Sequence, residues 1–310
     1  MNPLQRILVV DGPDRSSDEA LVRAAALAKG PGAEIAVLAP IGHVPRLFPG
    51  ADLDVEELVV EAHRTQLAAT AARLRALGAT VRTKLRVGVP VVEIVREVLE
   101  SRAELLVKVQ DPSNARRSRF GSADNQLLRK CPCPVWIVRP GERLPYTRIV
   151  AAVDPFDDRP GRDARLDHKI LDWALRIARQ DRAELVIAHA WELVGESLLA
   201  GARGGLSPAA LTALRDEVRR EHAAKLESLV RSMDPLGLNP RVQLVMGRAD
   251  AVIPALVERE RAELLVMGTV ARSGIAGFVI GNTAEQILAE LGAAVLAVKP
   301  AGFVSPITRD

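Results

Sequence analysis

The chain has 310 residues, about two average domains, and 48% of them are hydrophobic, enough to bury ordinary globular cores. Its 42 Lys and Arg against 39 Asp and Glu leave a net charge of +3, and 3% of its residues are aromatic, so a nucleic-acid-binding protein is not expected. Apolar runs fall short of the roughly 18 residues of a membrane span, and the run at 7–10 ends in an acid without a cleavage-site pattern, so a cytoplasmic location is expected.

Short apolar runs alternate with segments that have helical spacing of apolar residues, which is typical of parallel strands joined by helices. In chain order, the first half predicts strands at 6–10, 34–38, 81–87, 104–109 and 135–138, and helices at 18–29, 55–77, 91–101 and 122–130. The second half predicts strands at 148–153, 184–189, 241–246, 263–267 and 294–298, and helices at 163–179, 207–233, 249–260 and 282–291. Residues 141–145 form the natural linker. The glycines at 195, 201, 204 and 205 are expected to lie in a loop, of which 201–205 is expected to be flexible.

The two halves repeat one another. The phrase RAELLV begins at residues 102 and 261, which are 159 residues apart, and from Gly121 and Gly281 onward the offset becomes 160. We therefore predict a duplicated α/β fold with domains at 1–140 and 146–300. Each is expected to be a doubly wound, Rossmann-like, five-stranded parallel sheet of strand order 3-2-1-4-5 with right-handed crossovers. The last strand of each half would be an apolar edge, so we expect the two edges to pair and make the chain a pseudo-dimer.

A ligand is expected where strands 1 and 4 of the second half end, because strand order reverses there. Strand 1 leads to Asp154, and strand 4 leads to Gly268, which permits close backbone approach. Gly281 precedes a helix whose free N–H groups favour an anion, Asn282 is a good N-cap, and Arg272 could supply a cation. A glycine-rich loop that only turns is the alternative, and the position at the switch point favours a ligand site.

The segment 268–283 resembles the nucleotide loop of the universal stress protein family, Gly-x-x-Gly-x9-Gly-[Ser/Thr]. Ala271 replaces the second glycine, and Asn282 replaces the hydroxyl residue. The phrases LLRKCPCPVWIV and GTVARSGIAGFVIGNTAEQIL are similar to those of tandem, E-type members. The resemblance implies that the second half binds ATP, with or without Mg. It places Asp154 against the adenosine part and Ala190 near the adenine. It places Gly268, Ala271, Gly281 and Asn282 around the ribose and phosphates. Arg272 and Thr283 of the same segment are also predicted to bind the nucleotide.

The first half departs from that loop. Val109 stands where the second half has Gly268, and the segment that follows carries three arginines, at 116, 117 and 119. We therefore predict that the first half does not bind ATP in the family manner. A solvated loop is favoured over a second anion site, because arginines are mostly exposed.

Two further residue sets favour structural roles. Cys131 and Cys133 align with Leu291 and Ala293, which favours packing over a redox or metal role. His189 lies within an apolar strand, which favours a hydrogen-bonded core residue over a catalyst.

The resulting hypothesis is a regulatory, nucleotide-binding stress protein with at most slow ATP hydrolysis, since no carboxylate or histidine of the loop is placed to activate water. The alternative is a nucleotide-independent scaffold or sensor that binds an apolar, lipid-like ligand or a protein partner. An adenylate-forming or flavin-related enzyme ranks last, for want of a catalytic constellation. The sequence leaves open whether pseudo-dimers associate further.

Overall fold

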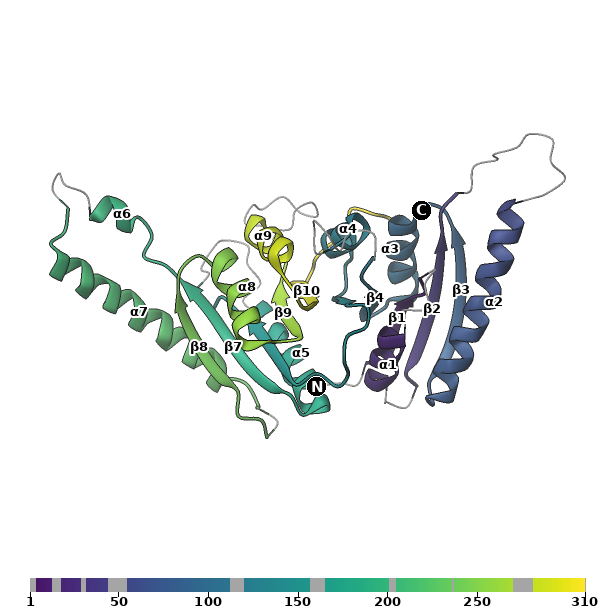
Figure 1. Cartoon of the computed structure of the whole chain (residues 1–310), viewed down its shortest axis with the longest axis horizontal. Coiled ribbons are helices and arrows are strands. Elements are labelled where there is room, and N and C mark those ends of the chain that lie inside the picture. The colour runs from purple at the N-terminus through teal and green to yellow at the C-terminus, as the bar shows by residue number, and fades with distance from the viewer. Residues whose placement is uncertain are drawn as a thin grey trace. The chain divides into compact units, whose positions relative to one another are not determined.

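The computed structural model describes residues 4–12, 18–28, 32–43, 55–111, 120–156, 165–200, 205–235, 237–269 and 281–309. The chain forms two compact units (Figure 1). The first unit comprises Met1–Leu144, Thr269–Gly281 and Ala294–Asp310, and the second comprises Pro145–Gly268 and Asn282–Ala293.

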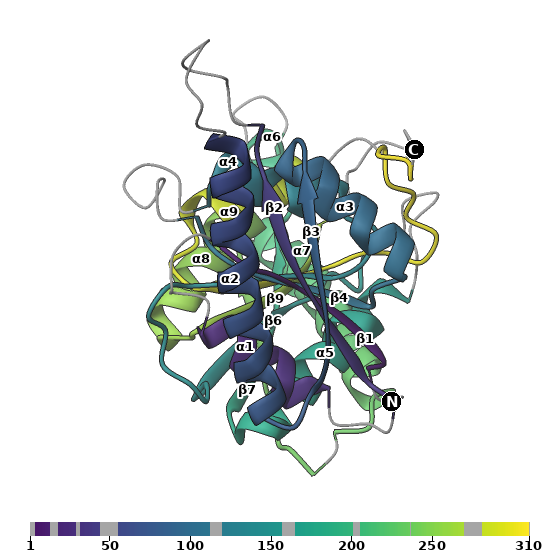
Figure 2. The same cartoon turned by 90° about the vertical axis from the view of Figure 1, so that its right-hand side faces the viewer.

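The first unit contains six strands in the order β3-β2-β1-β4-β5-β10. Their bounds are β1 (Arg6–Val10), β2 (Glu34–Ile41), β3 (Thr80–Val87), β4 (Leu105–Val109), β5 (Val135–Val138) and β10 (Ala294–Val298). β1 to β5 run parallel, whereas β10 pairs antiparallel with β5. The helices are α1 (Asp18–Leu27), α2 (Val55–Ala76), α3 (Pro90–Ser101) and α4 (Ser122–Lys130). In Figure 2, α2 runs alongside β2 and β3.

The second unit contains four parallel strands in the order β9-β6-β7-β8. Their bounds are β6 (Arg148–Ala152), β7 (Glu184–Trp191), β8 (Arg241–Met246) and β9 (Leu264–Gly268). The helices are α5 (Leu166–Asp181), α6 (Glu196–Leu199), α7 (Pro208–Arg231), α8 (Ala249–Glu260) and α9 (Asn282–Glu290). The Ser207 hydroxyl caps α7 by accepting from the Ala210 N–H at 3.2 Å, and Pro208 opens the helix, as the sequence predicts.

The predicted α/β fold class is confirmed. The first half has the predicted strand order, and the last strands, β5 and β10, pair with each other. All side chains of β5 and β10 are buried, as continuous apolar runs imply for strands covered on both faces.

Two local predictions differ from the structure. β2 continues beyond residue 38 to Ile41, because its last residues pair with the end of β3, a partner that lies outside the local sequence. The segment expected to be only a loop contains α6, which follows Gly195 in the left-handed conformation.

Candidate functional site

The carboxyl end of β6 carries an exposed acid. Asp154 lies two residues beyond β6, its side chain is 57% exposed, and its N–H donates to the buried Asp167 carboxylate on α5 at 3.0 Å. β6 lies between β7 and β9, so this acid stands where strand order reverses. Ala190 lies near the end of β7 and is half-buried.

Gly268 ends β9 against the first turn of α5. A Cβ added there would lie 3.0 Å from Leu166 Cδ2, tighter than ordinary van der Waals contact. The missing side chain therefore lets β9 and α5 pack closely.

The glycine loop is only partly described. Ala271 and Arg272 lie outside the described residues. Gly281 is buried, Asn282 is exposed and Thr283 is half-buried. α9 begins at Asn282, so Gly281 rather than Asn282 occupies the cap position, a difference of one residue. The predicted nucleotide contacts of all these residues stay predictions.

Two buried histidines lie beside Asp154. His189 Nδ1 is 3.1 Å from the Val153 carbonyl and 3.8 Å from the Asp154 carboxylate. A carbonyl only accepts, so Nδ1 carries a hydrogen, and neutral His189 must accept at Nε2. The donor to His189 Nε2 is His222 Nδ1, at 2.7 Å. In neutral His222 the other ring nitrogen, Nε2, then carries a lone pair and no hydrogen. The prediction of a hydrogen-bonded core role for His189 is confirmed, whereas sequence reasoning missed its partner on α7.

Aromatic rings surround this pair. Phe156 stacks on His222 with ring centroids 4.0 Å apart, and Lys225 Nζ lies 3.9 Å from the Phe156 centroid. Burial lowers the pKa of His222, and a charge on His189 would lower it further. The Asp154 carboxylate raises this pKa, whereas the charge of Lys225 lowers it. The folded protein therefore favours the neutral form of His222.

This depressed pKa predicts a loss of stability in mild acid. An unfolded histidine takes up a proton near pH 6.5, whereas folded His222 does so at lower pH. Between the two pKa values the unfolded state binds more protons, so the free energy of unfolding falls with decreasing pH by up to about 1.4 kcal/mol per unit. Urea denaturation from pH 7.5 to 5.5 measures the slope.

The variant His222→Gln is expected to flatten that slope, because glutamine cannot titrate yet can donate to His189 Nε2. His43→Gln is the matched control, since His43 is exposed in the first unit. Equal slopes for wild type and His222→Gln would contradict the assignment to this pair.

The first half places one of its own carboxylates at the start of α4. Asp124 is fully buried, and its Oδ2 accepts from the N–H groups of Gly121 and Asp111, both at 3.1 Å. Its Oδ1 accepts from Lys108 Nζ at 2.8 Å, and Lys108 also reaches the Asp111 carboxylate at 2.6 Å. Burial raises the pKa of Asp124, against the charge of Lys108.

The second half lacks this internal anion. In the repeat, Asp124 aligns with Ala284 and Lys108 aligns with Met267. Ala284 has no side-chain acceptor to offer the Gly281 N–H, which is the counterpart of the Gly121 N–H that donates to Asp124. Comparing the two repeats position by position, with attention to charges that replace apolar residues, could have found this difference.

A protein-family model described as “Universal stress protein family” matches residues 3–139 and 145–299 of the chain. The chain belongs to the universal stress protein family. It is 28% identical to universal stress protein E of Escherichia coli K12, over 71% of this chain and 68% of that protein. It is 26% identical to the universal stress protein E homolog of Haemophilus influenzae, over 66% and 64% of the two chains.

Solved structures share the fold of this tandem universal stress protein. A functionally unknown protein from Pseudomonas aeruginosa PAO1 superposes with a TM-score of 0.73 at 25% identity, covering 96% of this chain and 93% of that one. A putative universal stress protein from P. aeruginosa UCBPP-PA14 gives 0.72 at 26% identity, with 96% and 94% covered. Such long coverage shows that the tandem arrangement is shared.

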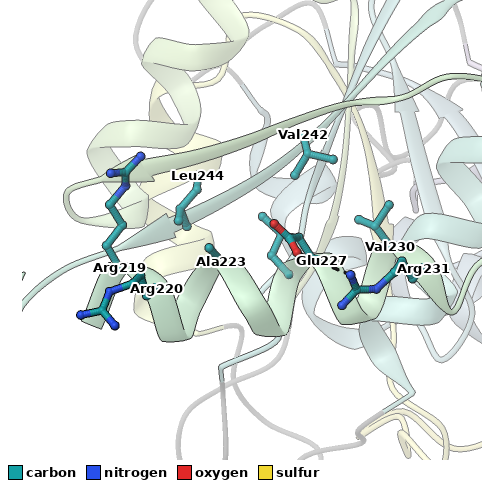
Figure 3. A pocket seen from close by; sticks show the side chains of 9 residues that line it. Arg219, Arg220, Ala223, Glu227, Val230, Arg231, Val242 and Leu244 are labelled. Carbon is teal, nitrogen blue, oxygen red and sulfur yellow. Dashed lines mark ion pairs between the residues drawn. The ribbon is translucent and has the colours of Figure 1, made fainter. Parts of the chain in front are cut away.

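A separate hollow of about 700 Å³ lies between α7 and β8 (Figure 3). Val242 and Leu244 project from β8 toward the apolar side of α7, and arginines stand at both ends of the helical segment. The lining residues are Arg219, Arg220, Ala223, Leu226, Glu227, Val230, Arg231, Val242 and Leu244. None of the predicted nucleotide residues is among them.

Within the described ranges, no group of three or more His, Cys, Asp or Glu is placed to hold a metal ion. Among the helices that the structure describes, none combines the length and apolar character needed to span a bilayer.

Proposed function

We propose that this tandem universal stress protein binds ATP, or a related adenine nucleotide, in its second half, and acts in the cytoplasm as a regulator rather than as an enzyme. One observation carries the proposal. At the start of α4 the chain supplies its own anion, Asp124, whereas at the start of α9 the corresponding residue is Ala284. The Gly281 N–H, the counterpart of the Gly121 N–H, therefore has no such carboxylate at position 284.

The residues present fit a nucleotide. The N–H groups that open α9 suit the phosphates, and Arg272 adds a positive charge. The exposed carboxylate of Asp154 can accept from ribose hydroxyls. ATP would bring its own Mg, held mainly by its phosphate oxygens.

A nucleotide that binds the folded chain stabilises it. At 100 times its Kd, ATP is expected to add about 2.7 kcal/mol, which corresponds to a rise in Tm of roughly 5–10 °C for a unit of this size. Thermal unfolding with ATP, GTP and inorganic triphosphate measures the effect. Equal shifts with ATP and triphosphate would contradict an adenine nucleotide site, and no shift with ATP would contradict the proposal as a whole.

The hollow between α7 and β8 favours a second candidate, a sensor of an apolar ligand with an anionic head group. Its volume of about 700 Å³ suits a small ligand, and Arg219, Arg220 and Arg231 could pair with the head group. Mass spectrometry of a solvent extract of the purified protein separates the two candidates. An adenine nucleotide supports the first, and an acyl chain without nucleotide supports the second.

A further inference from the structure

The segment Cys131-Pro132-Cys133 brings two thiols together where α4 ends and β5 approaches. Cys131 Sγ and Cys133 Sγ are 3.5 Å apart, and the side chains are 0% and 7% exposed. Two sulfur atoms at that distance touch, so no other atom lies between them. The whole chain has no further cysteine, so any disulfide within one molecule must join these two.

The buried ammonium group of Lys299 interacts electrostatically with the two thiols. Lys299 follows β10, is 5% exposed, and donates to the Leu128 carbonyl in the last turn of α4 and to Thr269 Oγ1 at 2.8 Å. Burial lowers its pKa to about 8, and the two cysteines oppose that shift. A neighbouring cation favours the thiolate form of a cysteine.

The two thiols are not equivalent. Burial raises the pKa of both. At Cys131 the hydrogen bonds with the Cys133 side chain and backbone outweigh burial, and the charge of Lys299 adds a smaller effect in the same direction, so the pKa of Cys131 is lowered. The pKa of Cys133 stays well above the ordinary value, because burial and the adjacent Cys131 sulfur both disfavour its charge. Cys131 is therefore the thiol of the pair that gives up its proton more readily.

We propose that Cys131 and Cys133 form a reversible intrachain disulfide when the protein meets a hydroperoxide. The thiolate attacks the terminal peroxide oxygen, so an S–O bond forms, the O–O bond breaks, and the leaving hydroxide or alkoxide takes a proton to give water or an alcohol. The second thiol then attacks the sulfenic sulfur, an S–S bond forms, and a second water leaves with the S–O oxygen. Two electrons pass from the thiols to the peroxide.

The geometry suits a labile bond. A disulfide between residues two apart closes a very small ring, and strained disulfides are more readily reduced by dithiols than structural ones. Hydrogen peroxide is close to water in size, and of the two buried thiols Cys133 is the one with exposed surface, 7%. The second half has Leu291 and Ala293 at these positions, so this chemistry is confined to one half of the chain.

The test is to treat the reduced full-length protein with hydrogen peroxide, quench, and count thiols under denaturing conditions. The expected result is a fall from two free thiols to none, with a mass decrease of two hydrogens, no dimer on a non-reducing gel, and full recovery with dithiothreitol. Persistence of both thiols, stable gain of oxygen, or intermolecular disulfides would overturn the proposal.

Two variants test the roles of Cys133 and Lys299 separately. Cys133→Ala copies Ala293 of the second half, and it should yield a trappable sulfenic acid at Cys131 but no disulfide. Lys299→Met should slow oxidation near neutral pH on the order of tenfold, since a rise of one unit in thiol pKa removes about nine tenths of the thiolate. If Lys299→Met does not fold, the wild-type pH–rate profile decides. If the oxidation rate reaches half its maximum below about pH 8.5, the profile supports the role of Lys299, and a midpoint at or above that pH contradicts it.

Discussion

Replacing Asp124 with alanine is expected to destabilise the first unit by about 3–5 kcal/mol, because it leaves the buried Lys108 ammonium without its buried partner. The change also removes the acceptor for the Gly121 and Asp111 N–H groups. Urea denaturation of the full chain measures the loss. Hydrogen exchange should locate the loosened segments at β4 and α4.

The repeat supplies the matched controls for that prediction. Asp124→Ala and Lys108→Met each copy the aligned residue of the second half, Ala284 and Met267. Apolar replacement of both members of a buried ion pair is often nearly neutral, whereas breaking the pair is costly. The double variant should therefore be more stable than Asp124→Ala alone. If the double variant loses as much free energy of unfolding as the two single variants together, the two residues are not a coupled pair.

Ala284→Asp is expected to weaken ATP binding by roughly 10²- to 10³-fold, since it places in the second half the carboxylate that the first half already has. Two like charges about 4 Å apart interact by about 4 kcal/mol near a protein surface, enough for such a loss. The prediction rests on the proposed nucleotide function. Calorimetric titration with ATP measures it.

Ala284→Asn is the control for size, because the amide matches aspartate in shape without its charge. It should retain far more affinity than Ala284→Asp. A second variant, Met267→Lys combined with Ala284→Asp, rebuilds the complete ion pair and guards against a loss of binding caused by unfolding. If Ala284→Asp binds ATP as tightly as wild type, the phosphates do not lie at the start of α9.

The sequence predicted the elements that depend on local pattern. Alternating strands and helices, the duplication and the pairing of the last strands all follow from apolar periodicity and from repeat offsets. The contacts between distant side chains did not follow. His189 and His222 are 33 residues apart, and their hydrogen bond depends on how α7 packs on β7, which no local pattern encodes.

The ion pair of the first half was missed for a different reason. Lys108 lies inside a strand, and Asp124 lies inside a helix, where single charges are ordinary surface residues unless burial is known. The comparison of each residue with its apolar counterpart in the second half is what indicates that the two charges are buried and paired. The roles of Ala271 and Arg272 remain predictions, because both lie outside the described residues.

The asymmetry between the halves is tested most directly by native mass spectrometry of the full chain with ATP, followed by the same measurement on Ala284→Asp. Our account predicts one nucleotide per chain for the wild type and none for the variant at the same concentration. Two nucleotides per chain, or none on the wild type, would contradict it.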